Sequence, residues 1–98
     1  MDDRRAFARL PYTGTLEYPV QHSAVARAFD ISRRGVGFTG PSPVTVGQML
    51  DIVLMNRNVV VKGYVRHMRP EGSGAYRVGV EFDDDQEELV NVLLETAS

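Results

Sequence analysis

The sequence contains no cysteine, and this absence removes two kinds of structure at once. Neither a structural disulfide nor a metal site built from thiolates can form, and nothing in the composition points to an oxidising compartment. Long apolar runs are also missing, because stretches such as residues 51–55 fall far short of the roughly 20 residues of a membrane-spanning helix. No apolar segment with a small-residue cleavage site follows Arg4-Arg5, as a secretion signal would require. We therefore expect a cytoplasmic protein that does not insert into a membrane.

Basic residues are in the minority, with 11 Lys and Arg against 13 Asp and Glu and a formal net charge of -2. General nucleic-acid binders usually carry a basic excess, so we expect any anion site to be local. His22 and His67 lack the spacing of metal ligands, and residues 83–85 lack the glycine and distal glutamate of a calcium loop. No nucleophile with a base, carboxylate pair or phosphate loop is recognisable. We expect no metal, no cofactor and no enzymatic activity.

Short alternating runs of β-branched and aromatic residues occupy the chain between residues 12 and 82. Gly, Pro, Asn and Ser separate these runs, a pattern typical of strands. In the last run Tyr76, Val78, Val80 and Phe82 share one face by the strand period of two, so we expect this face in the core. The pattern predicts strands near residues 12–18, 23–29, 35–39, 48–55, 59–68 and 76–82.

Turn residues indicate how these strands are connected. Residues 56–58 predict a short hairpin, residues 70–74 a longer one, and residues 40–43 a rigid loop. We expect successive strands to be antiparallel neighbours. Closing the sheet into a six-stranded antiparallel barrel would leave no exposed edges.

A helix is predicted over residues 84–96, where the apolar period changes from that of a strand to that of a helix. Asp84 and Glu87 have the spacing of a capping box at its start. A chain of 98 residues is the size of one domain. We divide it into an arm (1–11), a barrel (12–82) and a helix (84–96). The apolar face of this helix comprises Leu89, Val90, Leu93 and Leu94.

The first polar cluster lies in the arm, where Arg4, Arg5 and Arg9 occur within six residues. Planar guanidinium groups bind phosphate through two parallel hydrogen bonds and also stack on bases, so this cluster suits a nucleotide. The alternative is a basic chain end that only faces water. Repulsion among the three charges predicts a mobile arm in the absence of ligand.

The second polar cluster is Asp30-x-Ser32-x-x-Gly35, between two predicted strands. A carboxylate accepts hydrogen bonds from the edge of guanine, a hydroxyl can bond phosphate or base, and a glycine permits close approach of the backbone. The alternative is a turn stabilised by Asp or Ser and closed by a glycine at positive φ. Arg33 and Arg34 occupy the free positions, either as contacts to a ligand or as a coat on the loop.

Arg5-x-x-x-Arg9 followed by Asp30-x-Ser32-x-x-Gly35 on an all-β pattern resembles the paired signature of the PilZ domain family. The last strand, Tyr76-Arg-Val-Gly-Val-Glu-Phe82, is also similar to that of the family. This resemblance implies a PilZ-type split β-barrel that binds cyclic di-GMP through the equivalents of Arg5, Arg9, Asp30, Ser32 and Gly35, with Arg4 assisting.

The resemblance further implies a bacterial second-messenger receptor. Such a receptor changes conformation when it binds its ligand and signals to a partner protein or a neighbouring domain. Family members control motility, biofilm formation and exopolysaccharide synthesis. The alternative is an adaptor of the same fold that binds proteins and no nucleotide.

Overall fold

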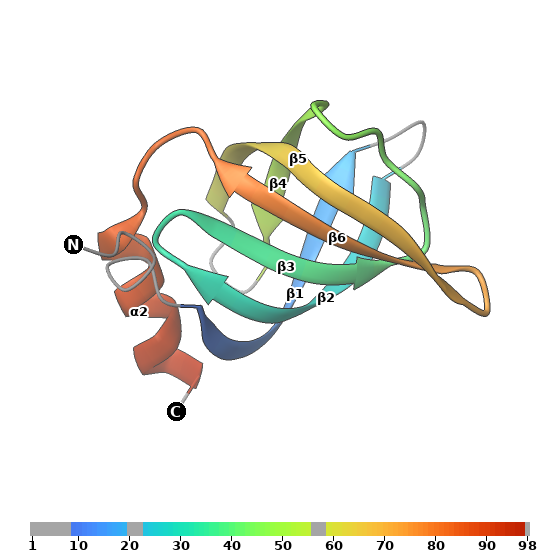
Figure 1. Cartoon of the computed structure of the whole chain (residues 1–98). Helices are drawn as coiled ribbons and strands as arrows, with labels where there is room; N and C mark the ends of the chain where they lie inside the picture. Colours follow the sequence, from blue (N-terminus) through green and yellow to red (C-terminus); the bar gives the residue numbers. More distant parts are fainter. Residues whose placement is uncertain (1–8, 20–22, 56–58, 98) are drawn as a thin grey trace.

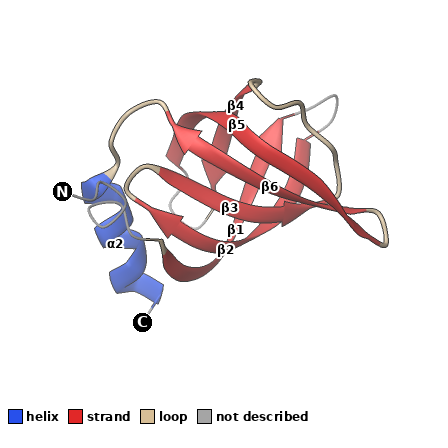
Figure 2. Ribbon diagram, viewed as in Figure 1, coloured by secondary structure: helices blue, strands red, loops and turns tan. Residues whose placement is uncertain are grey.

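The computed structural model describes residues 9–19, 23–55 and 59–97, which form a ring of strands and one helix (Figures 1 and 2). All neighbouring strands pair antiparallel, and the order β1-β2-β3-β6-β5-β4 closes through the pairing of β4 with β1. The six-stranded antiparallel barrel with a C-terminal helix is therefore confirmed. The elements are β1 (Leu10–Pro19), β2 (Ser23–Ser32), β3 (Gly35–Gly40), β4 (Met49–Leu54), β5 (Val59–Gly72), β6 (Ala75–Phe82) and α2 (Glu87–Ala97).

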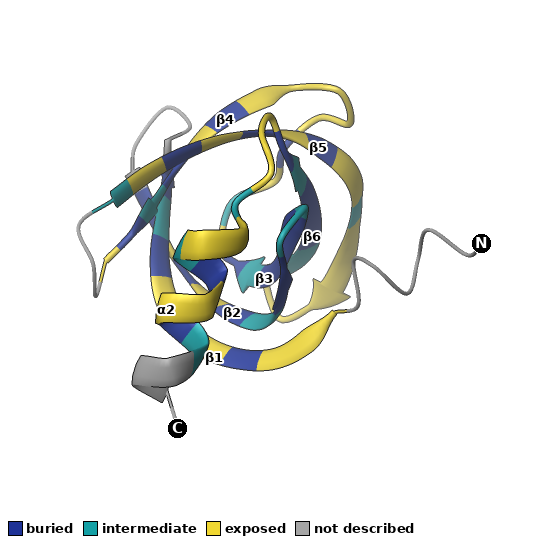
Figure 3. Cartoon of the chain, turned by 90° about the vertical axis from the view of Figure 1, so that its left-hand side faces the viewer, coloured by how far each residue is buried: buried dark blue, intermediate teal, exposed yellow. Residues whose placement is uncertain are grey.

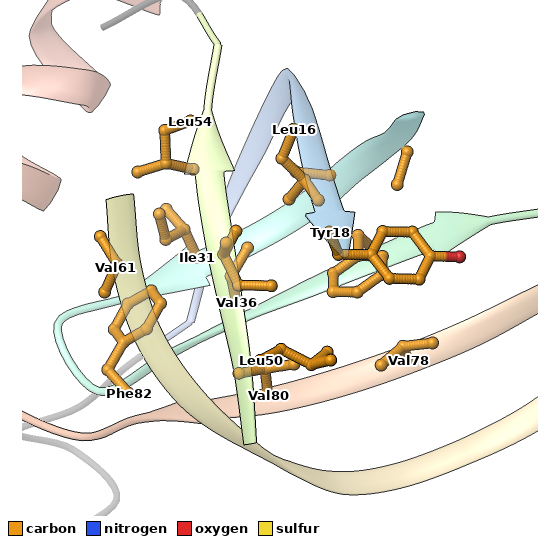
Figure 4. Close-up of a cluster of buried hydrophobic side chains, with 14 of the residues drawn as sticks. Leu16, Tyr18, Ile31, Val36, Leu50, Leu54, Val61, Val78, Val80 and Phe82 are labelled. Carbon is orange, nitrogen blue, oxygen red and sulfur yellow. The ribbon is translucent and has the colours of Figure 1, made fainter. Parts of the chain in front are cut away.

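The core fills the inside of the barrel with one face of every strand (Figure 4). In β6 the predicted inward residues Val78, Val80 and Phe82 are at most 2% exposed. Tyr18 and Phe38 pack with their ring centroids 4.9 Å apart, in the tilted geometry that aromatic pairs prefer. The alternation read from the sequence thus places the correct side chains in the interior.

Helix α2 lies across one opening of the barrel (Figure 3) and buries Val90 and Leu93. It begins at Glu87 and not at Asp84, so the predicted capping box is wrong. The cap is Asp85, whose Oδ1 accepts a hydrogen bond of 2.9 Å from the backbone N–H of Glu87. Three consecutive aspartates made the position of the cap ambiguous in the sequence.

Strands β3 and β4 are not neighbours, which corrects the expectation that all successive strands pair. Pro41 and Pro43 carry no N–H and cannot continue a ladder, so the connection runs across the end of the barrel instead. Tyr18 holds this connection: its hydroxyl donates to the carbonyl of Ser42 at 2.8 Å and accepts from the N–H of Ser42 at 2.9 Å. Burial raises the pKa of Tyr18, so the hydroxyl stays a neutral donor.

The predicted loop 70–74 is mostly strand, because β5 continues to Gly72 and β6 begins at Ala75. Ser73 and Gly74 form a two-residue turn with positive φ angles of 54° and 75°, the combination that fits the twist of a tight hairpin. Pro70 is tolerated because β4 pairs with β5 only as far as Tyr64. The predicted hairpin loop at 56–58 lies outside the described residues.

Strand β1 begins at Leu10, two residues earlier than predicted. Leu10 pairs with Ile31 and Pro11 with Asp30, because β2 also extends further than expected, to Ser32. The last two residues of the predicted arm therefore belong to the barrel. This extension brings Arg9 next to Asp30.

Candidate functional site

Antiparallel pairing of β1 with β2 places the end of the arm beside the end of β2. Arg9 directly precedes β1, and Asp30 lies opposite Pro11 in the paired strands. Arg9 and Asp30, which are 21 positions apart in sequence, are thus neighbours in space. The pairing of β1 with β2 is what brings these two residues together.

Arg9 and Asp30 form an ion pair that joins the two clusters. The Nε and Nη2 atoms of Arg9 donate to Oδ1 of Asp30 at 3.0 Å and 2.7 Å. The side chains are 45% and 26% exposed, so both remain accessible from solvent. The reading of the arm as a basic end that only faces water does not hold for Arg9, while the mobility of the arm without ligand stays a prediction. Arg4 and Arg5 lie outside the described residues.

Ser32 stabilises the tight hairpin between β2 and β3. It pairs with Gly35 across the two-residue turn Arg33-Arg34 and is only 3% exposed. Its Oγ accepts a hydrogen bond of 3.2 Å from the N–H of Arg34. In this structure the hydroxyl therefore serves the turn, and it shapes the loop that follows Asp30.

Gly35 is required by a close contact between strands rather than by a left-handed turn. Its φ is not positive, so the glycine part of the turn alternative is wrong, while the turn stabilised by Ser32 is present. A Cβ at this position would lie 2.4 Å from the backbone carbonyl oxygen of Val80 on β6. Only glycine allows β3 and β6 to approach this closely here.

Arg33 and Arg34 attach the hairpin to the chain segment that leads into α2. Arg33 Nε donates to Asp85 Oδ2 at 2.7 Å, and its backbone carbonyl accepts from the N–H of Gln86 at 2.8 Å. The bond from Arg33 lowers the pKa of Asp85 below its usual range. Arg34 Nη2 lies 3.6 Å from Glu81. These contacts give both arginines a structural role, so they do more than coat the loop.

On the outer face of the barrel next to Asp30, Gly37 and Gly79 pair with each other and form a flat area, here called the glycine floor. The sequence did not reveal this feature. Asp30 pairs with Gly37, Gly37 with Gly79, and Gly79 with His67, in one row across β2, β3, β6 and β5. A Cβ at Gly37 would lie 2.7 Å from both Asp30 Oδ1 and the ring of Phe29. Glycines at outward positions of two strands were the available signal, but their pairing needed the topology.

Neither a metal cluster nor a membrane helix is found in the described part of the chain. Residues 9–19, 23–55 and 59–97 contain no group of three or more His, Cys, Asp or Glu placed to hold a metal ion. Among the same residues, no helix has the length and apolar composition to cross a membrane.

Comparison with known protein families identifies the group to which this chain belongs. The family model described as the PilZ domain matches residues 3–96, nearly the whole chain. This chain belongs to the PilZ domain family. The match extends over the arm, the barrel and most of α2.

A solved structure supports the PilZ fold. The chain is similar to the Bacillus subtilis Inhibitor of motility (MotI/DgrA), with a TM-score of 0.73 and 14% sequence identity. The similarity covers 96% of this chain and 49% of the other, so this chain spans about half the length of that protein. At this identity the likeness concerns the fold alone. No curated protein sequence matches the chain.

Proposed function

We propose that this PilZ domain is a receptor for the bacterial second messenger cyclic di-GMP. The ligand would be bound by Arg4, Arg5 and Arg9 from one cluster and by Asp30 from the other, where Ser32 and Gly35 complete the site by fixing the hairpin. The observation that carries the proposal is the contact between Arg9 and Asp30, which brings a guanidinium and a carboxylate together at one exposed place. A guanidinium suits a phosphate and a carboxylate suits the edge of guanine, so this pair supports such a ligand.

The chemistry of the ligand matches the two charges of this pair. The Watson–Crick edge of guanine offers adjacent N–H donors, and a carboxylate accepts but cannot donate. When guanine engages Asp30, the guanidinium of Arg9 can turn to the phosphate or to the face of the base. Ser32 and Gly35 contribute by fixing the hairpin that carries Asp30. The site acts by binding, and we propose no catalytic step.

A conformational signal would start from the exchange of Arg9 between Asp30 and the ligand. The arm would then settle on the barrel in a new position and present a new surface to a partner protein or a neighbouring domain. A neighbouring domain fits the similarity to a chain about twice as long. We propose a cytoplasmic role, with motility, biofilm formation or exopolysaccharide synthesis as the output.

Replacing Asp30 with alanine should remove the preference for guanine. The parent chain should bind cyclic di-GMP more tightly than cyclic di-AMP, because the adenine edge presents an acceptor to the carboxylate. We expect Asp30→Ala to weaken cyclic di-GMP binding about tenfold. The difference in affinity between cyclic di-GMP and cyclic di-AMP should therefore become smaller. Isothermal titration calorimetry with both ligands measures this.

Asp51→Ala is the matched control for this experiment. Asp51 is an exposed strand carboxylate that also pairs with a cation, Lys62 at 3.5 Å, but it lies on β4. The Asp51→Ala variant should bind both ligands with the affinity of the parent. Equal affinity of the parent for the two ligands would refute guanine recognition by Asp30. If the parent binds neither nucleotide, the alternative of an adaptor that binds only proteins remains.

A further inference from the structure

Phe29 and Arg77 form a stacked pair on the outer face of the barrel, beside Asp30. The Cζ atom of Arg77 on β6 lies 3.9 Å from the centroid of the Phe29 ring on β2. This is the distance of direct contact between a guanidinium and an aromatic face. The pair spans from β2 to β6 across the intervening strand β3.

Gly37 makes room for this arrangement. Atoms of the Phe29 ring and Oδ1 of Asp30 both lie 2.7 Å from the point where a Cβ of Gly37 would be. The ring edge and the carboxylate are therefore no further apart than twice that distance. The stacked pair and the proposed guanine acceptor thus share one glycine floor.

Arg77 is also held from the side by an acidic residue. Its Nη1 lies 3.4 Å from Oε2 of Glu71, and Oε1 of Glu71 accepts from the hydroxyl of Thr39 at 3.3 Å. The side chain of Arg77 is nevertheless 38% exposed. Its guanidinium is thus positioned by Phe29 and Glu71 and still accessible from solvent.

We infer that Arg77, supported by Phe29, is the stacking platform for the guanine whose edge Asp30 accepts. This inference rests on the proposed function and adds a residue outside both sequence clusters. Guanidinium planes stack well on bases, and Arg77 needs no phosphate to balance its charge because Glu71 already does so. Face and edge of one guanine would then be recognised by two adjacent groups.

Arg77→Lys is the test, because it keeps the positive charge and removes the planar group. Stacking on a base is worth about 1–3 kcal/mol, so we expect cyclic di-GMP binding to weaken about tenfold in calorimetry. Arg69→Lys is the matched control, since Arg69 is exposed and lies opposite Arg77 on β5. Arg69→Lys should change the affinity for cyclic di-GMP by less than about twofold. Phe29→Leu should weaken binding in the same direction as Arg77→Lys.

The outcomes separate this inference from the proposed function. If the parent binds cyclic di-GMP and Arg77→Lys binds equally well, the platform is wrong while the receptor stands. Equal losses in Arg77→Lys and Arg69→Lys would show a general effect of replacing an arginine on this face, and would also overturn the platform. No binding by the parent would overturn both. Thermal unfolding of each variant, and the NMR shift of the Arg77 Nε–H on saturation, report whether the fold is intact and the group meets the base.

Discussion

Arg9→Ala is expected to weaken binding of cyclic di-GMP by about 1.5–3 kcal/mol, or roughly 10- to 150-fold. This is the range for hydrogen bonds to charged groups, and the substitution removes a group that the structure places at the junction of the two clusters. The variant also leaves Asp30 without this partner, which makes the carboxylate more accessible but takes away the cation that would face the phosphate. Calorimetric titration of parent and variant measures the difference.

The same substitution should change the free energy of unfolding very little. The pair is 45% and 26% exposed at its two side chains, and ion pairs at such sites contribute about 0–1 kcal/mol to stability. Lys62→Ala is the control, because it breaks another exposed ion pair, with Asp51, on the strands β4 and β5. It should leave ligand affinity unchanged. An Arg9→Ala chain that titrates like the parent would remove Arg9 from the site.

Gly35→Ala is expected to destabilise the domain by about 1–3 kcal/mol, the usual range for overpacking. The added Cβ would stand 2.4 Å from the carbonyl oxygen of Val80, and a backbone atom cannot move aside as a flexible side chain can. The strands β3 and β6 must separate locally, which weakens the ladder behind the proposed site. Urea unfolding of parent and variant gives the free energy directly.

Gly74→Asn provides a comparison for Gly35→Ala. Gly74 has a φ of 75° with open space around it, and asparagine tolerates this conformation better than most residues. Its effect on stability should be the smaller of the two. Unchanged stability of Gly35→Ala together with lost ligand binding would contradict the structural role and make Gly35 a direct ligand contact.

Much of the fold could be predicted because its signals are local. The alternation of Val78, Val80 and Phe82, and the helical spacing of Val90 and Leu93, follow from the sequence and place these side chains in the core. The first and last residues of the strands were harder to predict, because they depend on how far the neighbouring strand extends. Strand β1 starts early only because β2 supplies paired residues as far as Ile31.

The sequence indicated candidate residues for the site, but it did not indicate which of them lie together. The sequence identified Arg9 and Asp30, yet their contact depends on the register between β1 and β2. Phe29 and Arg77 meet across β3, which lies between their strands and pairs with each of them. Pairing of strands that are distant in sequence leaves no pattern in a single chain, so this part of the face needed the structure.

The most direct test of the proposed receptor is a calorimetric titration of the unmodified chain with cyclic di-GMP, beside GTP and a short single-stranded oligonucleotide. We predict saturable binding of cyclic di-GMP, weaker binding of GTP and none of the oligonucleotide, since the net charge is -2 and the anion site is local. A folded chain that gives no binding signal with cyclic di-GMP, or that prefers the oligonucleotide, would contradict the proposal.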